Sequence, residues 1–398
     1  MIEQGSKEYW RATTALSLGS FLVFELLYLA QPLLPIFREQ FGLSPATSSL
    51  SLSIVTFTIS LSLLFYGPLS DSIGRRPIMM ITMFGAMVTT FLVLFATDYK
   101  TIVILRGVQG LFLGGLPSLA MAYMSEEFSP KALSLAIGIY ISANSVGGMS
   151  GRLISGFAAD LWGWKASFLV IGLMSILFFI LFVWLLPPST QFQKTPLHLK
   201  GAAKSLYLHI KNPVLLLAFI IGGLHFFIFI GFFNFLTFRL SDDPYHLSPS
   251  FIGMLFLTYL AGTISSTLSG KLAQKWGKTT CLMVGIGIYA LGIMVSLAQH
   301  LVMILLGVLI VCFGFFFSHS AATSWVNVKA TFARASASSL YLVMYYLGGS
   351  LGSFYLGFFW HHWHWAGIVF GSLLILCVTT FCTWKLKKTE YPQTVNWG

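Results

Sequence analysis

Three ionisable side chains lie within long apolar segments of the sequence, where their chemistry is costly to maintain. They are Glu25, Arg106 and Arg152. A charge at the centre of a bilayer costs about 2.5–3.5 kcal/mol even on the lower scales, so such residues usually serve a site. A carboxylate can carry a proton, and a guanidinium can bind an anion through two parallel hydrogen bonds. We therefore predict that Glu25 couples to protons and that Arg106 and Arg152 bind substrate.

A second group of charged residues lies between two apolar segments, in Gly67-Pro-Leu-Ser-Asp71-Ser-Ile-Gly74-Arg75-Arg76-Pro77. A passive turn would explain its glycines and arginines, but not Asp71, an acid where bases are favoured. We predict a gating motif made of Gly67, Asp71, Gly74, Arg75 and Arg76. The nearby acidic pair, Glu126 and Glu127, is the expected partner of Arg75 or Arg76.

These residues must be positioned by membrane-spanning helices. The chain is 56% hydrophobic and only 9% charged, which excludes an ordinary soluble surface. A helix needs about 20 apolar residues to cross the hydrocarbon core. Runs of that length predict twelve spans, at 12–36, 49–69, 77–97, 101–124, 132–157, 166–186, 213–238, 250–270, 279–299, 301–324, 335–358 and 366–385.

The net charge of +11 does not indicate nucleic-acid binding, because the basic residues follow the membrane topology. With both termini in the cytoplasm, most Lys and Arg lie in cytoplasmic segments, as the positive-inside rule requires. Short loops favour a bacterial inner membrane.

No motif for ATP or hydrolytic chemistry is present. The His/Trp run 360–365 is typical of a membrane interface, so we predict no metal, no cofactor and no enzyme activity.

Several matches at a nearly constant offset indicate a duplicated chain. Gly270-Lys-Leu-Ala-Gln-Lys-Trp-Gly277-Lys278 repeats both glycines of the gating motif and places Gln274 where Asp71 would fall. We predict two six-helix halves, 1–186 and 213–398, joined by a cytoplasmic linker, 187–212, in which 199–210 forms a short helix. Small residues let helices approach closely in lipid. The glycines expected to do so are Gly138, Gly147, Gly148, Gly151, Gly156, Gly348, Gly349, Gly352 and Gly357.

The repeat register shows that the buried charges belong to one half only. Arg106 corresponds to Leu306, Arg152 to Ser353, and Glu25 approximately to Phe229. A structural ion pair is the alternative interpretation, but it gives less reason for such asymmetry. Charges of this kind are expected to face a cavity. The polar residues expected beside them are Asn144, Asn234 and His319.

The sequence resembles the major facilitator superfamily over its full length. Residues 67–77 match that family's loop motif, and Arg106-Gly107-Val-Gln109-Gly110 looks like its fourth-helix motif. The segment 132–157 is similar to the antiporter motif, with Arg152 in place of a proline and Ser155 in place of a glycine. The run Leu-Tyr-Leu-Ala-Gln-Pro-Leu-Leu-Pro is similar to the YnfM-type branch of bacterial efflux permeases.

The resemblance implies a twelve-helix, all-α secondary transporter that works by alternating access. Two cations and one carboxylate favour an anionic or zwitterionic solute, such as an organic acid or a siderophore, exported in exchange for protons. The alternatives are a proton-coupled importer, a broad-specificity drug efflux pump and a non-transporting sensor or scaffold. The expected partners are membrane lipids, a small-molecule substrate and protons, with the chain acting as a monomer.

Overall fold

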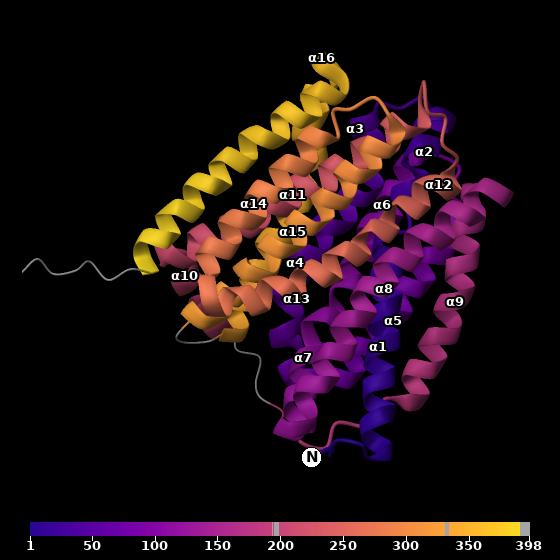
Figure 1. Ribbon diagram of the computed structural model, residues 1–398. Coiled ribbons are helices and arrows are strands. Elements are labelled where there is room, and N and C mark those ends of the chain that lie inside the picture. Colours follow the sequence, from indigo (N-terminus) through magenta and orange to yellow (C-terminus); the bar gives the residue numbers. More distant parts are fainter. Residues whose placement is uncertain (193, 195–198, 331–333, 391–398) are drawn as a thin grey trace, which may run out of the picture. The chain divides into compact units, whose positions relative to one another are not determined.

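The computed structural model describes residues 1–192, 194, 199–330 and 334–390, and these residues are helical apart from turns and one isolated bridge between Ile2 and Phe128 (Figure 1). Eleven stretches of the described chain are long and apolar enough to cross a membrane. The last stretch is 53 residues long, Ser336–Lys388. It lies in α16 (Arg334–Glu390), which is non-helical at Trp363 and His364. A count of twelve spans therefore stays a prediction.

The helices fall into two compact units. The first unit holds α1 (Lys7–Tyr28), η1 (Gln31–Leu33), α2 (Leu34–Phe41), α3 (Pro45–Ser48), α4 (Leu50–Ile73), α5 (Arg75–Leu92), η2 (Val93–Phe95), α6 (Tyr99–Leu113), α7 (Gly115–Glu127), α8 (Pro130–Trp162), α9 (Trp164–Leu185) and α12 (Pro249–Met254). The second unit holds α10 (Leu199–Lys211), α13 (Tyr259–Trp276), α14 (Lys278–Val295), α15 (Leu301–Lys329) and α16.

The helix α11 (Pro213–Ser241) is shared between the units, as is the short turn η3 (Leu255–Thr258). Residues Asn234–Leu257 belong to the first unit, whereas Lys200–Phe233 belong to the second. Polar contacts explain the first assignment. Arg38 in α2 donates to both oxygens of Asp242, at 2.7 and 2.5 Å. Ser248 donates to Asp160 of α8 at 2.8 Å. A division at the linker stays a prediction, and residues 193 and 195–198 of that linker lie outside the described residues.

The first span is interrupted, and proline is the physical reason. Its helix α1 ends at Tyr28, a 3-10 turn follows at Gln31–Leu33, and α2 begins at Leu34. Pro32 and Pro35 have no backbone N–H, so a continuous helix would lose hydrogen bonds at both positions. The interruption leaves carbonyl oxygens at the end of α1 without helical partners.

The gating motif is more helical than the sequence suggests. The helix α4 continues through Gly67, Pro68 and Asp71 to Ile73, and α5 begins at Arg75. Only Gly74 separates them, with a φ of 117°, which is a backbone conformation that glycine adopts without strain. Gly277 joins α13 to α14 in the same way, with a φ of 81°. The expected turn is thus a single residue in both copies.

Glycines bring α8 against α1, which pack along each other. A Cβ built at Gly147 would lie 2.3 Å from the carbonyl oxygen of Phe21, and one at Gly151 would lie 2.4 Å from that of Glu25. A Cβ at Gly156 would lie 2.4 Å from the oxygen of Pro249. At Gly148 the nearest atom is in the Tyr28 ring, 3.3 Å away.

The second unit repeats this arrangement between α16 and α11. A Cβ at Gly348 would meet the carbonyl oxygen of Gly223, and one at Gly352 would meet that of Phe227. At Gly349 the neighbour is the Phe226 ring. Gly357 lies half-buried in α16. By these contacts Glu25 corresponds to Phe227, so the sequence register, which gave Phe229, was displaced by two residues.

Gly138 does not take part in close packing. It is exposed on α8, and a Cβ built there meets nothing within 4 Å. The expectation that this glycine packs against a neighbouring helix is therefore wrong for this structure. The glycine spacing alone did not distinguish the packed face of α8 from its exposed face.

Alanine substitutions should have opposite effects at these two kinds of glycine. Gly151→Ala places a methyl group against the α1 backbone, which cannot move aside locally, and should destabilise the protein by about 1–3 kcal/mol. Gly138→Ala should stabilise α8 by about 0.5–1 kcal/mol, because alanine is the better helix former. Thermal unfolding in detergent measures both. Equal unfolding temperatures for the two variants would contradict the assigned packing.

Candidate functional site

The interruption after α1 is where most of the predicted polar side chains meet. Four of them contact the region Ser20–Gln31 from other helices of the first unit. They are Arg106 on α6, Asn144 and Arg152 on α8, and Asn234 on α11. Glu25 lies on α1 itself.

Arg106 holds the end of α1. Its two terminal nitrogens donate to the carbonyl oxygens of Leu26 and Leu27, both at 2.8 Å. Its Nε donates to the Ser51 carbonyl at 3.1 Å, and Gln109 accepts a further short hydrogen bond. The end of a helix carries partial negative charge, which favours a cation there. A substrate contact by Arg106, as the sequence predicts, would require some of these bonds to break.

Arg152 is fully buried beside the same interruption. Its Nε donates to Gln31 Oε1 at 2.7 Å, and its Nη1 donates to the Gly148 carbonyl at 2.8 Å. The guanidinium lies over the ring of Tyr28 at 3.8 Å from the centroid and over that of Phe256 at 4.3 Å. Stacking on aromatic rings stabilises a buried guanidinium and orients its donors.

The Arg152 contacts continue through Gln31 to Asn234. Gln31 Nε2 donates to Asn234 Oδ1 at 2.7 Å, and both side chains are fully buried. This polar chain therefore links α8, η1 and α11 within the first unit. It places two predicted substrate residues, Arg152 and Asn234, on either side of Gln31.

Glu25 has fewer hydrogen-bond partners than the two arginines of the site. Its side chain is 0% exposed, and among the described residues neither carboxylate oxygen has a hydrogen-bond partner. It lies three residues before Tyr28, or about 4.5 Å along the helix axis. Five residues earlier, Ser20 donates a short hydrogen bond to Asn144 Oδ1. A buried carboxylate without donors is strongly disfavoured in its charged form.

Tyr28, Gln31 and Phe256 were missed by the sequence reasoning. Gln31 and Tyr28 were visible in the run Leu-Tyr-Leu-Ala-Gln-Pro-Leu-Leu-Pro, where two prolines close to a buried amide indicate an interrupted helix. The Phe256 contact depends on a fold-back of the chain from beyond residue 240. No local pattern marks that residue.

His319 lies apart from this group, in the second unit. Its Nδ1 is 3.0 Å from the Tyr341 hydroxyl, and its ring stacks on Phe315 with centroids 5.8 Å apart. Stacked rings continue around it, with Phe226 on Tyr345 and Phe229 on Phe315, both at 3.8 Å. The surroundings of His319 in the second unit are thus mainly aromatic and buried.

Arg75 is the centre of the gating motif. Its guanidinium pairs with Asp71 at 2.5 Å and with Glu126 at 2.8 Å, and it also donates to Ser70. The expected pairing of Arg75 with the acidic pair is present, through Glu126. Arg76 instead donates to the Val183 carbonyl at 3.2 Å. One guanidinium therefore ties α4, α5 and α7 together.

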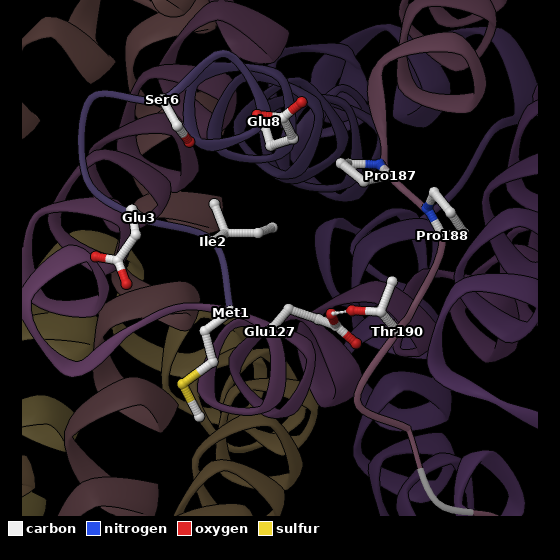
Figure 2. A pocket seen from close by; sticks show the side chains of 9 residues that line it. All are labelled: Met1, Ile2, Glu3, Ser6, Glu8, Glu127, Pro187, Pro188 and Thr190. Atoms are coloured by element: carbon white, nitrogen blue, oxygen red, sulfur yellow. Dashed lines mark hydrogen bonds between the residues drawn. The ribbon is translucent and has the colours of Figure 1, made fainter.

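Glu127 has a different role from its neighbour. Its side chain is buried and accepts from Thr190 Oγ1 at 2.8 Å and from the Gln191 N–H at 2.9 Å, which fixes the start of the linker. Its own carbonyl accepts from the Ile2 N–H at 2.6 Å. Beside it lies a pocket of about 450 Å³, shown in Figure 2 and lined by Met1, Ile2, Glu3, Ser6, Glu8, Glu127, Pro187, Pro188 and Thr190.

No group of three or more His, Cys, Asp or Glu that could hold a metal ion occurs within the described ranges. Of the His residues in the run 360–365, His362 Nδ1 lies 2.8 Å from the Phe358 carbonyl oxygen. His364 falls at the bend in α16. The described residues of this site therefore act through buried charges and hydrogen bonds.

Replacing Arg106 by lysine tests whether the hydrogen bonds of Arg106 to the end of α1 stabilise the protein. Lys keeps the charge but cannot reach Ser51, Leu26 and Leu27 together, and each buried acceptor left unpaired costs about 1–3 kcal/mol. The unfolding temperature should fall clearly. Arg11→Lys is the matched control, because Arg11 makes a single exposed bond to the Trp184 carbonyl. Equal unfolding temperatures would contradict this role of Arg106.

The family model described as Major Facilitator Superfamily matches residues 16–353 and, separately, 242–396. A protein of Buchnera aphidicola subsp. Schizaphis graminum, named as an uncharacterized transporter, is 39% identical over 386 residues, covering 97% of this chain and 94% of that protein. The inner membrane transport protein YnfM of Escherichia coli K12 is 38% identical over 387 residues, covering 97% and 93%.

A solved structure has the same fold. It is that of a bacterial homologue of the human lysosomal transporter Spinster, in an inward-facing and unoccupied conformation. The TM-score is 0.79 at 15% sequence identity, over 98% of this chain and 100% of that one. With a family model that spans most of the chain and relatives near 40% identity, this multi-pass membrane protein belongs to the major facilitator superfamily, a family of transporters and not of enzymes.

Proposed function

We propose that the protein exports a small organic solute in exchange for protons, across a bacterial inner membrane and with both termini in the cytoplasm. Glu25 carries the proton, and Arg152 binds an anionic group of the solute. The YnfM relative is named as an inner membrane transport protein, which supports this location. The distribution of basic residues supports the orientation.

The observation that carries the proposal is that Glu25 is buried and its carboxylate has no hydrogen-bond donor among the described residues. A carboxylate that is fully buried, without a hydrogen-bond donor, binds a proton readily. An approaching cation would release that proton by stabilising the charged form. A group that changes protonation with its surroundings is what a proton-coupled transporter requires.

The surroundings of Arg152 support an anionic group on the solute. Four contacts of the guanidinium are with neutral groups, which are Gln31, the Gly148 carbonyl and the rings of Tyr28 and Phe256. A buried cation in such surroundings is stabilised by an anion, with which it can form a bidentate pair. An organic acid or a carboxylate-bearing siderophore would provide that group.

Whether the bound solute favours or opposes protonation of Glu25 then distinguishes import from export. A purely anionic solute close to Glu25 would favour its protonated form, so solute and proton would travel together, as in an importer. A zwitterion also brings a cation, which competes with the proton for Glu25. Exchange of solute for protons therefore favours a zwitterionic solute, and proton-coupled import of an anion is the second candidate.

Transport assays in proteoliposomes test the role of Glu25. A panel of organic acids and zwitterions first identifies a solute that accumulates under a pH gradient. Glu25→Gln should abolish that accumulation, because the amide cannot exchange a proton, while counterflow exchange of the solute persists through Arg152. Glu39→Gln, which removes an exposed carboxylate from α2, is the matched control and should leave the accumulation unchanged. Unaltered gradient-driven accumulation by Glu25→Gln would remove Glu25 from the coupling.

The gating role of the motif is also part of the proposal. Arg75 joins three helices only while its two carboxylate partners hold it. Alternating access requires contacts that form and break between discrete arrangements. The carboxylate partners are partly exposed to water, 45% for Asp71 and 30% for Glu126, and ion pairs in contact with water exchange partners at small cost.

Asp71→Asn should therefore leave insertion and abundance unchanged while reducing the rate of solute transport strongly, by about tenfold or more. Gln274→Asp, at the equivalent and exposed position of α13, is the matched control and should change little. Initial rates of solute uptake at equal protein amounts measure both. Equal rates for the wild type and Asp71→Asn would show that the Asp71–Arg75 pair is not a gate.

A further inference from the structure

Buried polar groups without a protein partner gather on one helix. Among the described residues, Tyr9, Thr13, Ser17 and Glu25 of α1 carry such atoms, whereas every other helix has at most one residue of this kind. Buried polar atoms in proteins are almost always hydrogen bonded, to protein or to ordered water. The three hydroxyl groups of α1 therefore require water as their partner.

Their spacing forms a row. Tyr9, Thr13 and Ser17 are each four residues apart, so they lie on one ridge of the helix. Successive members are separated by about 6 Å along the axis. A direct hydrogen bond between hydroxyls spans about 2.8 Å, so a single water between two members fits this separation. The same row, continued by eight residues, ends at Glu25.

One member of the row is apolar. Phe21 occupies the position between Ser17 and Glu25, and its ring packs on that of Phe178 with centroids 5.2 Å apart. Beside Phe21 the hydroxyl of Ser20 donates to Asn144. Polar groups on the neighbouring ridge therefore extend to Ser20, about 7.5 Å along the helix axis before Glu25.

The other end of the row, Tyr9, follows directly after a residue that lines the pocket of Figure 2. Glu8 lines that pocket and directly precedes Tyr9, and Glu3 and Glu127 contribute two further carboxylates. The Tyr9 ring packs against Phe128, next to Glu127, with centroids 5.8 Å apart. Carboxylates at an opening raise the local concentration of protons.

Three arginines near the row bind partners outside it. Arg106 and Arg152 lie beyond the Glu25 end of the row, where they bind main-chain carbonyls and Gln31. Arg11, on the same helix, donates to the Trp184 carbonyl of α9. Positions 9, 13, 17, 21 and 25 contain no Lys or Arg, so no cation of the row itself opposes a proton.

We propose that Tyr9, Thr13 and Ser17, joined by ordered water, form the proton path between the pocket at the N-terminal end of α1 and Glu25. The hydroxyls act as donors and acceptors in turn, so that a proton entering at the carboxylates of the pocket is passed along the row. This assignment rests on the proposed role of Glu25 as the proton carrier. It adds three residues that no sequence motif marked.

The experiment is a pH jump on the full-length protein in detergent, followed by time-resolved infrared spectroscopy. The carboxylic-acid band of Glu25 is identified by its loss in Glu25→Gln, and its rate of appearance after acidification is measured. Thr13→Val, which keeps the shape of the side chain, should slow that rate by about tenfold. Tyr9→Phe and Ser17→Ala should slow it too. Thr14→Val, at the exposed neighbouring position, should leave it unchanged.

The possible outcomes separate the path from the proposed function. If the Glu25 band appears at the wild-type rate in all three row variants, the path is wrong while the role of Glu25 stands. If Thr14→Val slows the band as much as Thr13→Val, the path is also wrong. If the wild type shows no band that Glu25→Gln removes, Glu25 does not bind protons, and the proposed coupling fails together with the path.

Discussion

The structure of the site depends on the hydrogen bonds that Arg106 donates to the C-terminal end of α1. Two prolines prevent the first span from being a continuous helix, and the resulting carbonyl oxygens would be costly to bury without donors. The guanidinium of Arg106 supplies those donors to Leu26 and Leu27. Because the interruption is stable, Gln31 can leave the helical pattern and bond both Arg152 and Asn234. Glu25 is thereby held within one turn of Tyr28, on whose ring Arg152 is stacked.

Close glycine contacts provide the second constraint. The α8 backbone approaches α1 at Phe21 and Glu25, and the α16 backbone approaches α11 at the equivalent positions, Gly223 and Phe227. The two units therefore share one packing design, as expected from a duplicated chain. They differ in the side chains that surround the packed helices. Charged and amide groups surround α1, whereas phenylalanine and tyrosine rings surround α11.

Much of the fold followed from local patterns. Apolar runs predicted the spanning helices, and glycine spacing predicted the contacts of Gly147 and Gly151, because both signals repeat within a single helix. The pairing of Arg75 with Glu126 could be expected because both residues lie close to helix ends on short connections. Gly138 was misassigned because spacing does not specify which face of a helix is packed.

The site itself was harder to predict. Arg106 pairs with main-chain oxygens, and these become available only because the helix is interrupted nearby. The Gln31–Asn234 bond joins residues 203 positions apart. Neither contact leaves a periodic pattern in the sequence. Glu25 could be identified as a buried acid, but its lack of hydrogen-bond donors depends on which neighbours face it.

The central claim is that a proton and a cationic group of the solute compete for Glu25. The most direct measurement is the number of protons exchanged when a transported solute binds to the purified protein in weakly buffered detergent solution, followed with a pH-indicator dye. The account predicts that binding releases protons from the wild type and that Glu25→Gln releases none. Proton uptake on binding, or a release that Glu25→Gln leaves unchanged, would contradict it.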